Sequence, residues 1–237
     1  MAYRKGIRMM KTITAVCLFG LLALMGCKDD LSNSSARNKD ASSNFPTSEP
    51  EQISKMKNPS ETQGAKIPKS VESAILGGGC FWCTEAVFER IKGVNEVISG
   101  YAGGKSKNPT YKEICTGESG HAEVIKIIYD PSILSFSKIL SIFAECHDPT
   151  TLNRQGADEG TQYRSTIMYL SPEQKKIAVK WKKSLSAKYI DPVVTEIVEA
   201  PTFYEAEDYH QDFYKKNPNQ GYCSFVIRPK LKKLNLE

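Results

Sequence analysis

The sequence predicts an α/β domain, built as an α+β two-layer sandwich around a ferredoxin-like core. Three observations lead to this prediction. Apolar, β-branched runs and amphipathic helix patterns follow one another in the order β-α-β-β-α-β. Glycines and an Asp-Pro pair separate these runs. An extra helix and strand, and then an irregular C-terminal tail, follow the core, as expected for one domain with an appended edge.

The first half of the core holds three strand patterns and one helix pattern. ESAILGG at 72–78 is a short apolar run that ends in glycines, which predicts a buried strand. Residues 80–92 repeat apolar side chains at helical spacing, and Gly93 ends this helix. VNEVISGY at 94–101 and EVIKIIYD at 123–130 predict the next two strands.

The second half begins with a helix over 136–147, for which Ser135 is the expected N-cap. The clearest helix opens at SPEQ, where Ser171 caps, Pro172 occupies the first turn and Gln174 completes a capping box. Strand patterns at 164–170 and 192–198 and a short helix at 205–216 complete the expected elements.

Three segments lie outside this pattern. The stretches 102–122 and 148–163 are rich in glycine and polar residues, and loops of this length in a compact domain tend to be functional. The basic tail at 228–233 is expected to be a solvated strap.

Charge and composition place limits on function. The 237 residues are 40% hydrophobic and 25% charged, with a net charge of +5. Residues 1–27 hold four basic side chains and no acidic one, so the rest has 28 basic and 27 acidic residues. This near-neutral remainder gives no electrostatic reason to expect a nucleic-acid partner.

The N-terminal segment predicts export. Residues 1–27 have a basic start, an apolar run of about 15 residues, and LMGC ending at Cys27, which resembles a bacterial lipobox with a lipidated cysteine. A plain cleaved signal or an anchor helix are the alternatives. Lys28 after the cysteine favours the outer membrane and periplasm if the envelope is Gram-negative. Residues 28–70 contain few large apolar side chains and predict a disordered tether, so the folded domain is expected at 71–237.

Of the seven cysteines, two lie in this leader, and Cys80, Cys83, Cys115, Cys146 and Cys223 remain. An odd number in an exported domain does not fit a framework of structural disulfides. Reactive thiol chemistry therefore becomes the hypothesis to test.

Cys80 has the most informative surroundings. It follows three glycines and begins a helix, where the dipole and free N–H groups lower a thiol pKa by up to about one. Gly77 to Gly79 would let backbone approach a ligand closely. The alternative is a buried, inert cysteine.

The Cys80-x-x-Cys83 spacing has three interpretations. It fits a thioredoxin-like redox pair, a nucleophile beside a resolving thiol, or half of a zinc site. The remaining zinc ligands would come from Cys115, His121, Cys146 and His147, although no second familiar ligand spacing is present. Phe81 and Trp82 between the cysteines indicate an apolar pocket beside the sulfur.

Nine segments then identify a family. They are GCFW, SGYAGG, NPTY, GHAEV, HDPT, QGAD, GTQYRS, FYEAEDYHQ and NPNQGYC, in this order. Together they closely resemble methionine sulfoxide reductase A over about residues 72–230. The resemblance implies an α/β sandwich with a ferredoxin-like core and reduction of methionine-(S)-sulfoxide, free or in proteins, to methionine, a repair of oxidised proteins under oxidative stress.

The resemblance also implies roles for individual residues. Cys80 is the nucleophile, and Glu123 is the acid near the sulfoxide oxygen. The expected hydroxyl donors are Tyr111 and Tyr163, and the expected substrate-binding residues are Phe81, Trp82 and Asp158. A carboxyl among aromatic rings should have a raised pKa. Taken singly, these residues would be an edge charge, packing tyrosines and a core tryptophan.

The resolving thiol stays open between Cys83 and Cys223, with a relay through both as a third possibility. Cys83 stands where glycine is frequent in the family, and Cys223 matches the place of a resolving cysteine in other members. The family's glycine-rich tail with a second recycling cysteine is missing, and SFVIRPKLKKL stands instead. We expect Cys115 and Cys146 to be buried packing residues, and His121 and His210 to be structural hydrogen bonders.

The implied cycle needs no bound cofactor or metal. Its partners are oxidised proteins or peptides and thioredoxin or another dithiol, and the expected oligomeric state is a monomer. Two rival functions remain at this point. One is a thioredoxin-like protein-disulfide oxidoreductase, and the other is a zinc-stabilised binding module.

Overall fold

The computed structural model describes residues 70–237. The predicted lipoprotein signal over 1–27, with Cys27, and the predicted tether up to residue 69 lie outside the described residues.

The centre of the domain is a six-stranded sheet with the order β7-β6-β1-β3-β2-β8. Its strands are β1 Glu72–Gly78, β2 Val94–Ala102, β3 Ala122–Tyr129, β6 Ser165–Tyr169, β7 Glu196–Glu199 and β8 Phe203–Glu205. Strand β3 runs antiparallel to both β1 and β2 and lies between them, and β6 is antiparallel to β1 on its other side. This is the arrangement of a split β-α-β unit, so the predicted ferredoxin-like core is confirmed.

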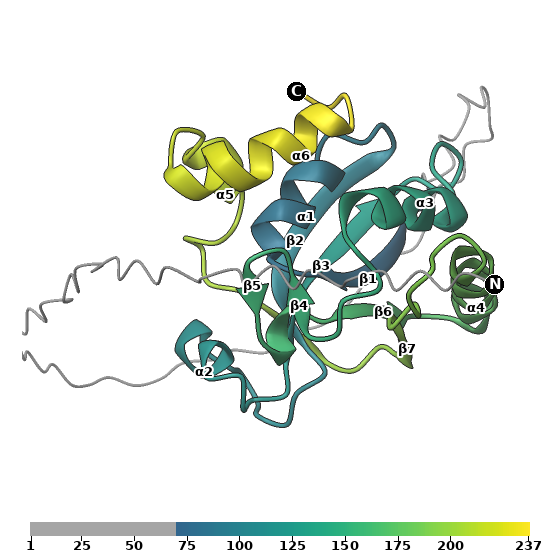
Figure 1. The fold of residues 1–237 in the computed structure, drawn as a ribbon, viewed down its shortest axis with the longest axis horizontal. Helices are drawn as coiled ribbons and strands as arrows, with labels where there is room; N and C mark the ends of the chain where they lie inside the picture. Colours follow the sequence, from purple (N-terminus) through teal and green to yellow (C-terminus); the bar gives the residue numbers. More distant parts are fainter. Residues whose placement is uncertain (1–69) are drawn as a thin grey trace, which may run out of the picture. The chain divides into compact units, whose positions relative to one another are not determined.

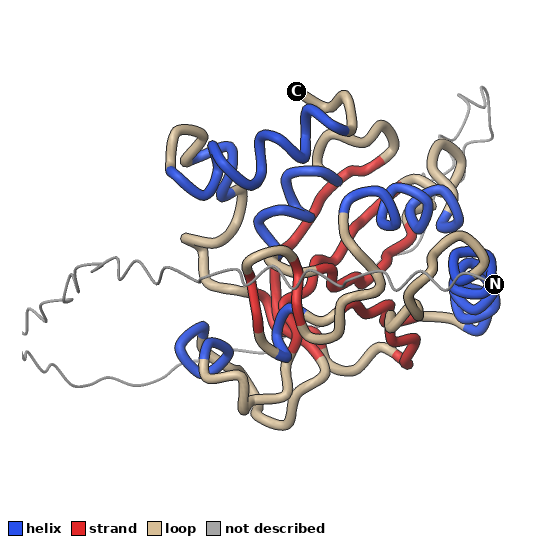
Figure 2. The backbone as a smooth tube through the Cα atoms, viewed as in Figure 1, coloured by secondary structure: helices blue, strands red, loops and turns tan. Residues whose placement is uncertain are grey.

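Helices pack mainly on one face of the sheet, where Figures 1 and 2 show α1 and α3 in front of the strands. The helices are α1 Phe81–Phe88, α2 Tyr111–Cys115, α3 Phe136–Cys146, α4 Pro172–Ser186, α5 Phe213–Lys216 and α6 Arg228–Lys233. A π-helical turn, Cys223–Ile227, leads into α6, and a 3₁₀ turn, Thr161–Tyr163, precedes β6. The hairpin of β4, Arg154–Gln155, and β5, Asp158–Glu159, forms a separate small sheet.

The hydrophobic core has two parts because the sheet has two covered faces. The larger part lies under the helices, and Leu76, Phe88 and Phe143 are among its fully buried members. The smaller part, on the other face, includes Ile75 and Met168 and is covered by Ala200 and Phe203.

Two predicted helix caps are confirmed, and one detail is wrong. The side chains of Ser135 and Ser171 each accept a hydrogen bond from the backbone three residues later. Gln174, however, does not close a capping box. Its side chain accepts from Leu170 N–H and donates to the Ser73 carbonyl, because it lies at the junction of α4 with β1.

The C-terminal third differs most from the prediction. Only Phe213–Lys216 of the expected 205–216 helix is helical, because Asp212 adopts a left-handed φ of 53° and the Gln211 side chain bonds to the Ser99 and Ala206 backbone. Of the strand expected at 192–198, only the last part forms, as β7 at Glu196–Glu199.

The expected solvated strap at 228–233 is also wrong. It is the helix α6, whose Leu231 is fully buried in the larger core, so an apolar side chain among the lysines fixes this segment. Figure 1 shows α5 and α6 beside α1.

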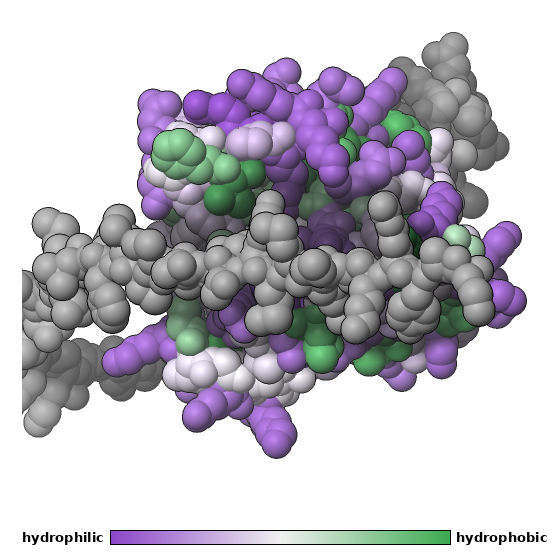
Figure 3. Space-filling view, in the orientation of Figure 1, coloured by the Kyte–Doolittle hydropathy of each residue, from purple (hydrophilic) through white to green (hydrophobic). Residues whose placement is uncertain are grey.

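No helix within residues 70–237 is both long and apolar enough to cross a membrane. In Figure 3, hydrophilic residues cover most of the visible surface of the described part, and hydrophobic residues gather at the upper left, where Figure 1 shows the C-terminal segment. Phe225, with 83% of its surface exposed, belongs to this segment.

Candidate active site

Cys80 lies where β1 ends and α1 begins, and it is the N-cap residue of that helix with φ −54° and ψ 124°. The preceding Gly79 has a φ of 90°, and a Cβ there would lie 2.5 Å from the Cβ of Gln155. A Cβ on Gly78 would lie 2.7 Å from the ring of Phe143. These two glycines therefore admit neighbouring protein groups, whereas the sequence led us to expect close approach of a ligand.

The Cys80 side chain borders a small cavity. Cys80 is 8% exposed and lines a cavity of about 170 Å³ together with residues of the β4–β5 hairpin and of the C-terminal segment. The other lining residues are Cys83, Gln155, Gly156, Ala157, Asp158, Tyr222, Val226 and Lys230. The thiol is thus neither on the open surface nor sealed in the core.

The expected lowering of the Cys80 pKa is wrong. Burial raises the pKa of the Cys80 thiol well above its ordinary value, and the neighbouring Cys83 and Glu123 raise it further. The helix terminus does not compensate, because the Phe81 N–H at the start of α1 donates its hydrogen bond to Glu123. In the resting site the Cys80 thiol is neutral at neutral pH.

Glu123 lies beside Cys80 at the start of β3 and is 2% exposed. Its Oε2 accepts a hydrogen bond of 3.0 Å from Phe81 N–H. Burial raises the pKa of this carboxyl to about 8, with smaller contributions from Asp158 and Cys83 and an opposing one from Phe81 N–H. The predicted upward shift is confirmed, and the carboxyl is protonated at neutral pH.

Two tyrosines from different loops lie near this carboxyl. Tyr111 begins α2 and Tyr163 ends the 3₁₀ turn before β6, so both long loops contribute to the site. Burial raises the pKa of each phenol. A hydrogen bond with Cys115 raises that of Tyr111 further, and the nearby Glu123 carboxyl adds to the shift of both once it ionises. Both phenols therefore keep their protons and can donate hydrogen bonds.

The aromatic wall of the site is fixed by residues from the C-terminal third. The Trp82 indole stacks on Phe213 at 3.6 Å between ring centroids and 5° between planes, and its Nε1–H donates to His210 Nδ1 at 3.1 Å. Phe81 is 1% exposed and packs within the core, so Trp82 is the more accessible ring of the two. The segment 205–216 thus orients the ring without forming the expected helix.

Cys83 lies on the first turn of α1 with its thiol hydrogen-bonded to that of Cys80, and its Sγ is 3.6 Å from the Tyr222 hydroxyl. The hydrogen bond with Cys80 lowers the pKa of Cys83 to about 7, and burial opposes it. Lys230 and Tyr222 lower this pKa as well. Cys83 is therefore the first of the two thiols to ionise.

Tyr222 connects the two thiols to Asp158. Its hydroxyl donates to Asp158 Oδ2 at 2.7 Å, so this predicted substrate-binding carboxylate holds a protein group. Tyr222 and Lys230 were missed in the sequence analysis. The motif GYC offered a signal for Tyr222, whereas only the fold brings Lys230 to this cavity.

The other thiols separate into three environments. Cys223 is fully buried in the π-helical turn, and burial raises its pKa. Cys146 is buried, as predicted. Cys115 is exposed, contrary to prediction, because it ends the short helix α2, of which only Ile114 is buried.

Histidines near the site make hydrogen bonds, as predicted. His121 Nδ1 accepts from Gly104 N–H, and His210 accepts from Trp82. Among residues 70–237, no three His, Cys, Asp or Glu side chains form a group that could hold a metal ion. The described domain therefore lends no support to a zinc site.

The profile of one known family, described as peptide methionine sulfoxide reductase, matches residues 72–237. The chain belongs to this family. It is accordingly an oxidoreductase that reduces methionine sulfoxide to methionine.

Curated family members are similar over most of their length. The peptide methionine sulfoxide reductase MsrA of Sulfolobus acidocaldarius is 60% identical over 163 residues, which cover 69% of this chain and 93% of that protein. MsrA 1 of Rhodopirellula baltica is 55% identical over 176 residues, or 74% of this chain and 92% of that protein.

Solved structures of family members share the fold. Mxr1 from Saccharomyces cerevisiae in reduced form matches with a TM-score of 0.63 and 34% identity, over 66% of this chain and 91% of that one. Methionine sulfoxide reductase A of Corynebacterium diphtheriae matches with a TM-score of 0.60 and 38% identity, over 68% of this chain and 80% of that one.

Proposed function

We propose that this enzyme reduces methionine-(S)-sulfoxide, free or in proteins, with Cys80 as nucleophile and Glu123 as acid. One observation carries this assignment. A carboxyl that is protonated at neutral pH lies next to a thiol that borders a cavity. A weakly electrophilic sulfoxide needs both groups, because its oxygen leaves only when it receives a proton.

The first step balances without an outside electron donor. The backbone N–H of Phe81 donates a hydrogen bond to Oε2 of Glu123. The other carboxyl oxygen, Oε1, is therefore the one that carries the proton to the sulfoxide oxygen. The Cys80 sulfur forms a bond to that oxygen, and the oxygen leaves the sulfoxide sulfur. The thiol proton of Cys80 passes to Glu123 and restores the carboxylic acid. A thiol and a sulfoxide are thereby converted into a sulfenic acid and methionine. The sulfoxide sulfur gains two electrons, and the cysteine sulfur loses them.

The surrounding groups position the substrate. We assign the phenols of Tyr111 and Tyr163 to hydrogen bonds with the sulfoxide oxygen, since both remain protonated beside Glu123. The methyl group of the substrate packs on Trp82, whose ring is backed from the core by Phe81. Asp158 acts at the margin of the site through Tyr222.

Cys83 is the resolving thiol in this proposal. It contacts Cys80 and has a pKa of about 7, so a thiolate is available at neutral pH to attack the sulfenic acid. Cys223 is fully buried in a helical turn, and burial raises its pKa, so it supplies less thiolate at neutral pH than Cys83 does. The resulting Cys80–Cys83 disulfide is reduced by thioredoxin or a similar dithiol, and no bound cofactor takes part.

The decisive assay is dithiothreitol-dependent reduction of both epimers of a methionine sulfoxide substrate. We expect turnover of the S epimer only, and no turnover by Cys80→Ser. Insulin-disulfide reduction without sulfoxide turnover would instead favour a protein-disulfide oxidoreductase.

We further propose that the enzyme is exported and lipid-anchored to the cell envelope through Cys27, as a monomer. The basic start, the short apolar run and the LMGC sequence support this proposal. Membrane fractionation of wild type and Cys27→Ala tests it. Unchanged membrane retention of the variant would contradict lipidation.

A further inference from the structure

Lys230 is a cation at the cavity that holds both active-site thiols. It lies on α6, in the C-terminal segment that stands where the resemblance leads one to expect a glycine-rich tail. The buried Leu231 next to it fixes α6 in the core, so the position of Lys230 is set by the fold. Lys230 lines the cavity together with Cys80 and Cys83.

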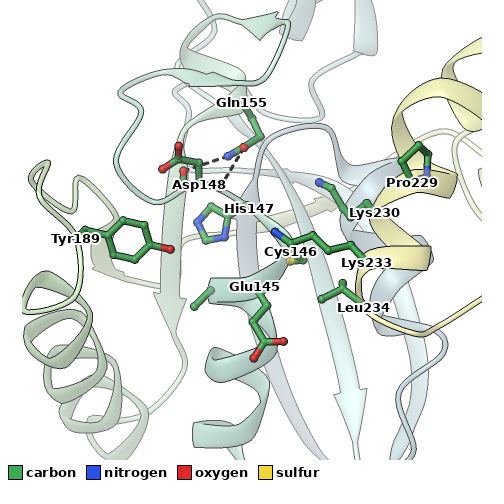
Figure 4. A pocket seen from close by; sticks show the side chains of 11 residues that line it. Glu145, Cys146, His147, Asp148, Gln155, Tyr189, Pro229, Lys230, Lys233 and Leu234 are labelled. Carbon is green, nitrogen blue, oxygen red and sulfur yellow. Dashed lines mark hydrogen bonds between the residues drawn. The ribbon is translucent and has the colours of Figure 1, made fainter.

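A second and larger cavity, of about 830 Å³, adjoins the first and shares Gln155 and Lys230 with it. Figure 4 shows Lys230 and Lys233 reaching from the C-terminal helix into this space, on the side facing His147 and Asp148. Lys233 lines the larger cavity but not the one with the thiols. The two lysines lie about one helical turn apart on α6, but only Lys230 lines the cavity that contains the thiols.

The basic residues on either side of Lys230 in the sequence form ion pairs. Arg228 and Lys232 both pair with Glu237. Within residues 70–237, no carboxylate lies at ion-pair distance from Lys230, which is half-buried. A half-buried ammonium without a carboxylate is free to act on an anion that forms in the cavity.

We propose that Lys230 is a positioning residue for the second half of the cycle, where its ammonium group stabilises the Cys83 thiolate that attacks the Cys80 sulfenic acid. This inference rests on the proposed function of Cys83. In the step, the S–S bond forms as the S–O bond of the sulfenic acid breaks, and the hydroxide takes one proton from solvent and leaves as water. No external electron is needed until a dithiol reduces the disulfide.

The charges around Cys83 are consistent with this role. Its thiol faces Cys80 from the start of α1, Tyr222 from the C-terminal segment, Asp158 from β5 and Lys230 from α6. Glu123 on β3 also interacts with it, although this carboxyl is neutral at neutral pH. Lys230 is the only cation among these groups, and Asp158 acts against it by raising the pKa of Cys83. Asp158 also accepts a hydrogen bond from the Tyr222 hydroxyl.

The test compares Lys230→Met with wild type, using Lys233→Met as matched control and Lys230→Arg as rescue. Reduced enzyme is mixed with one equivalent of methionine sulfoxide at pH 6 to 9, and methionine release and thiol loss are followed in the same samples. For Lys230→Met we expect unchanged methionine release, disulfide formation slowed about fivefold at pH 7, and a pH midpoint shifted upward by about one. Lys233→Met and Lys230→Arg should behave as wild type.

Two results would overturn the inference in distinguishable ways. Peptide mapping that finds a Cys80–Cys223 disulfide in the wild type contradicts the resolving role of Cys83 and the role of Lys230 together. A Cys80–Cys83 disulfide whose pH profile is unchanged in Lys230→Met contradicts the role of Lys230 alone. Thermal melting of each variant checks that α6 stays folded, and a rate loss restored by arginine excludes a merely structural effect.

Discussion

The groups on the two sides of Cys80 favour opposite protonation states. On the side of Glu123, burial keeps a carboxyl neutral, and two phenols close to it also retain their protons. On the side of Cys83, a hydrogen bond from the neighbouring thiol, Lys230 and Tyr222 favour a thiolate. One side can donate protons, whereas the other can supply an anion.

This difference shows how one sulfur can serve two successive reactions. The sulfoxide step needs a proton donor, and the disulfide step needs a nucleophile. Environments that push the pKa values of neighbouring groups apart are a general way to assign acid and base roles. The predictions below test each side separately, from the largest expected effect to the smallest.

The largest effect is expected from Cys80→Ser, which removes the sulfur common to both sides. Sulfoxide turnover should fall by at least about 10³-fold, because a serine oxygen, unlike a cysteine sulfur, cannot be oxidised by taking over the sulfoxide oxygen. Methionine release under dithiothreitol measures this loss. Turnover at the wild-type rate in the variant would contradict the assignment of Cys80 as the nucleophile.

Glu123→Gln removes the proton donor and keeps the shape of the side chain. We expect methionine release to fall about 10²-fold, within the usual range for general acid catalysis. The carboxyl has a pKa of about 8, so acid-dependent rate is present below pH 8 and lost as pH rises through that value. A single-turnover pH profile should show this decline in the wild type and not in the variant.

Alkylation of Cys80 is the control for this variant. It should change far less than methionine release. An equal loss of both would indicate misfolding, since the hydrogen bond from Phe81 N–H to Glu123 also helps to hold the start of α1.

Cys83→Ser tests the other side alone. The first equivalent of methionine should form at the wild-type rate, while the Cys80–Cys83 disulfide no longer forms and turnover with a protein dithiol falls about tenfold. Cys223→Ser is the matched variant, and its disulfide formation should remain. Free-thiol counts after one turnover distinguish the two, and disulfide formation retained in Cys83→Ser would exclude Cys83 as the sole resolver.

The smallest effect is expected from Phe213→Leu, which removes the ring stacked on Trp82. The loss of an aromatic pair is worth about 1 kcal/mol. We expect KM for a sulfoxide peptide to rise about fivefold with little change in kcat, because Trp82 binds the substrate and does not react. Steady-state kinetics at fixed dithiol concentration measure this, and a lowered kcat with unchanged KM would contradict it.

The strands and the long helices could be predicted because their signals are local. Glu72–Gly78 forms β1 with the bounds expected from its apolar run and its glycines, and Ser135 and Ser171 cap α3 and α4. The segment 205–216 could not be predicted in the same way. The Gln211 side chain bonds to the distant Ser99 backbone, and the backbone N–H groups of Asp212 and Phe213 donate to the Glu85 carboxylate on α1. These long-range bonds override the local helix preference of the segment.

In the candidate site, too, some features could be predicted from local motifs and others depend on long-range contacts. Its reactive residue types are visible in the motifs, including Cys80, Glu123 and the two loop tyrosines. The raised pKa of Glu123 was also expected, but the expected lowering of the Cys80 pKa is wrong because it ignored burial and the use of Phe81 N–H by Glu123. Tyr222 and Lys230 enter the site only through the path of the C-terminal segment.

The sequence by itself determined the order of elements, the ferredoxin-like core and the family, because these depend on local periodicity and on motifs read along the chain. Only the tertiary structure decided which thiol ionises first and which cation faces the thiols. Those properties depend on burial and on distances between residues far apart in the chain, and a linear pattern contains neither.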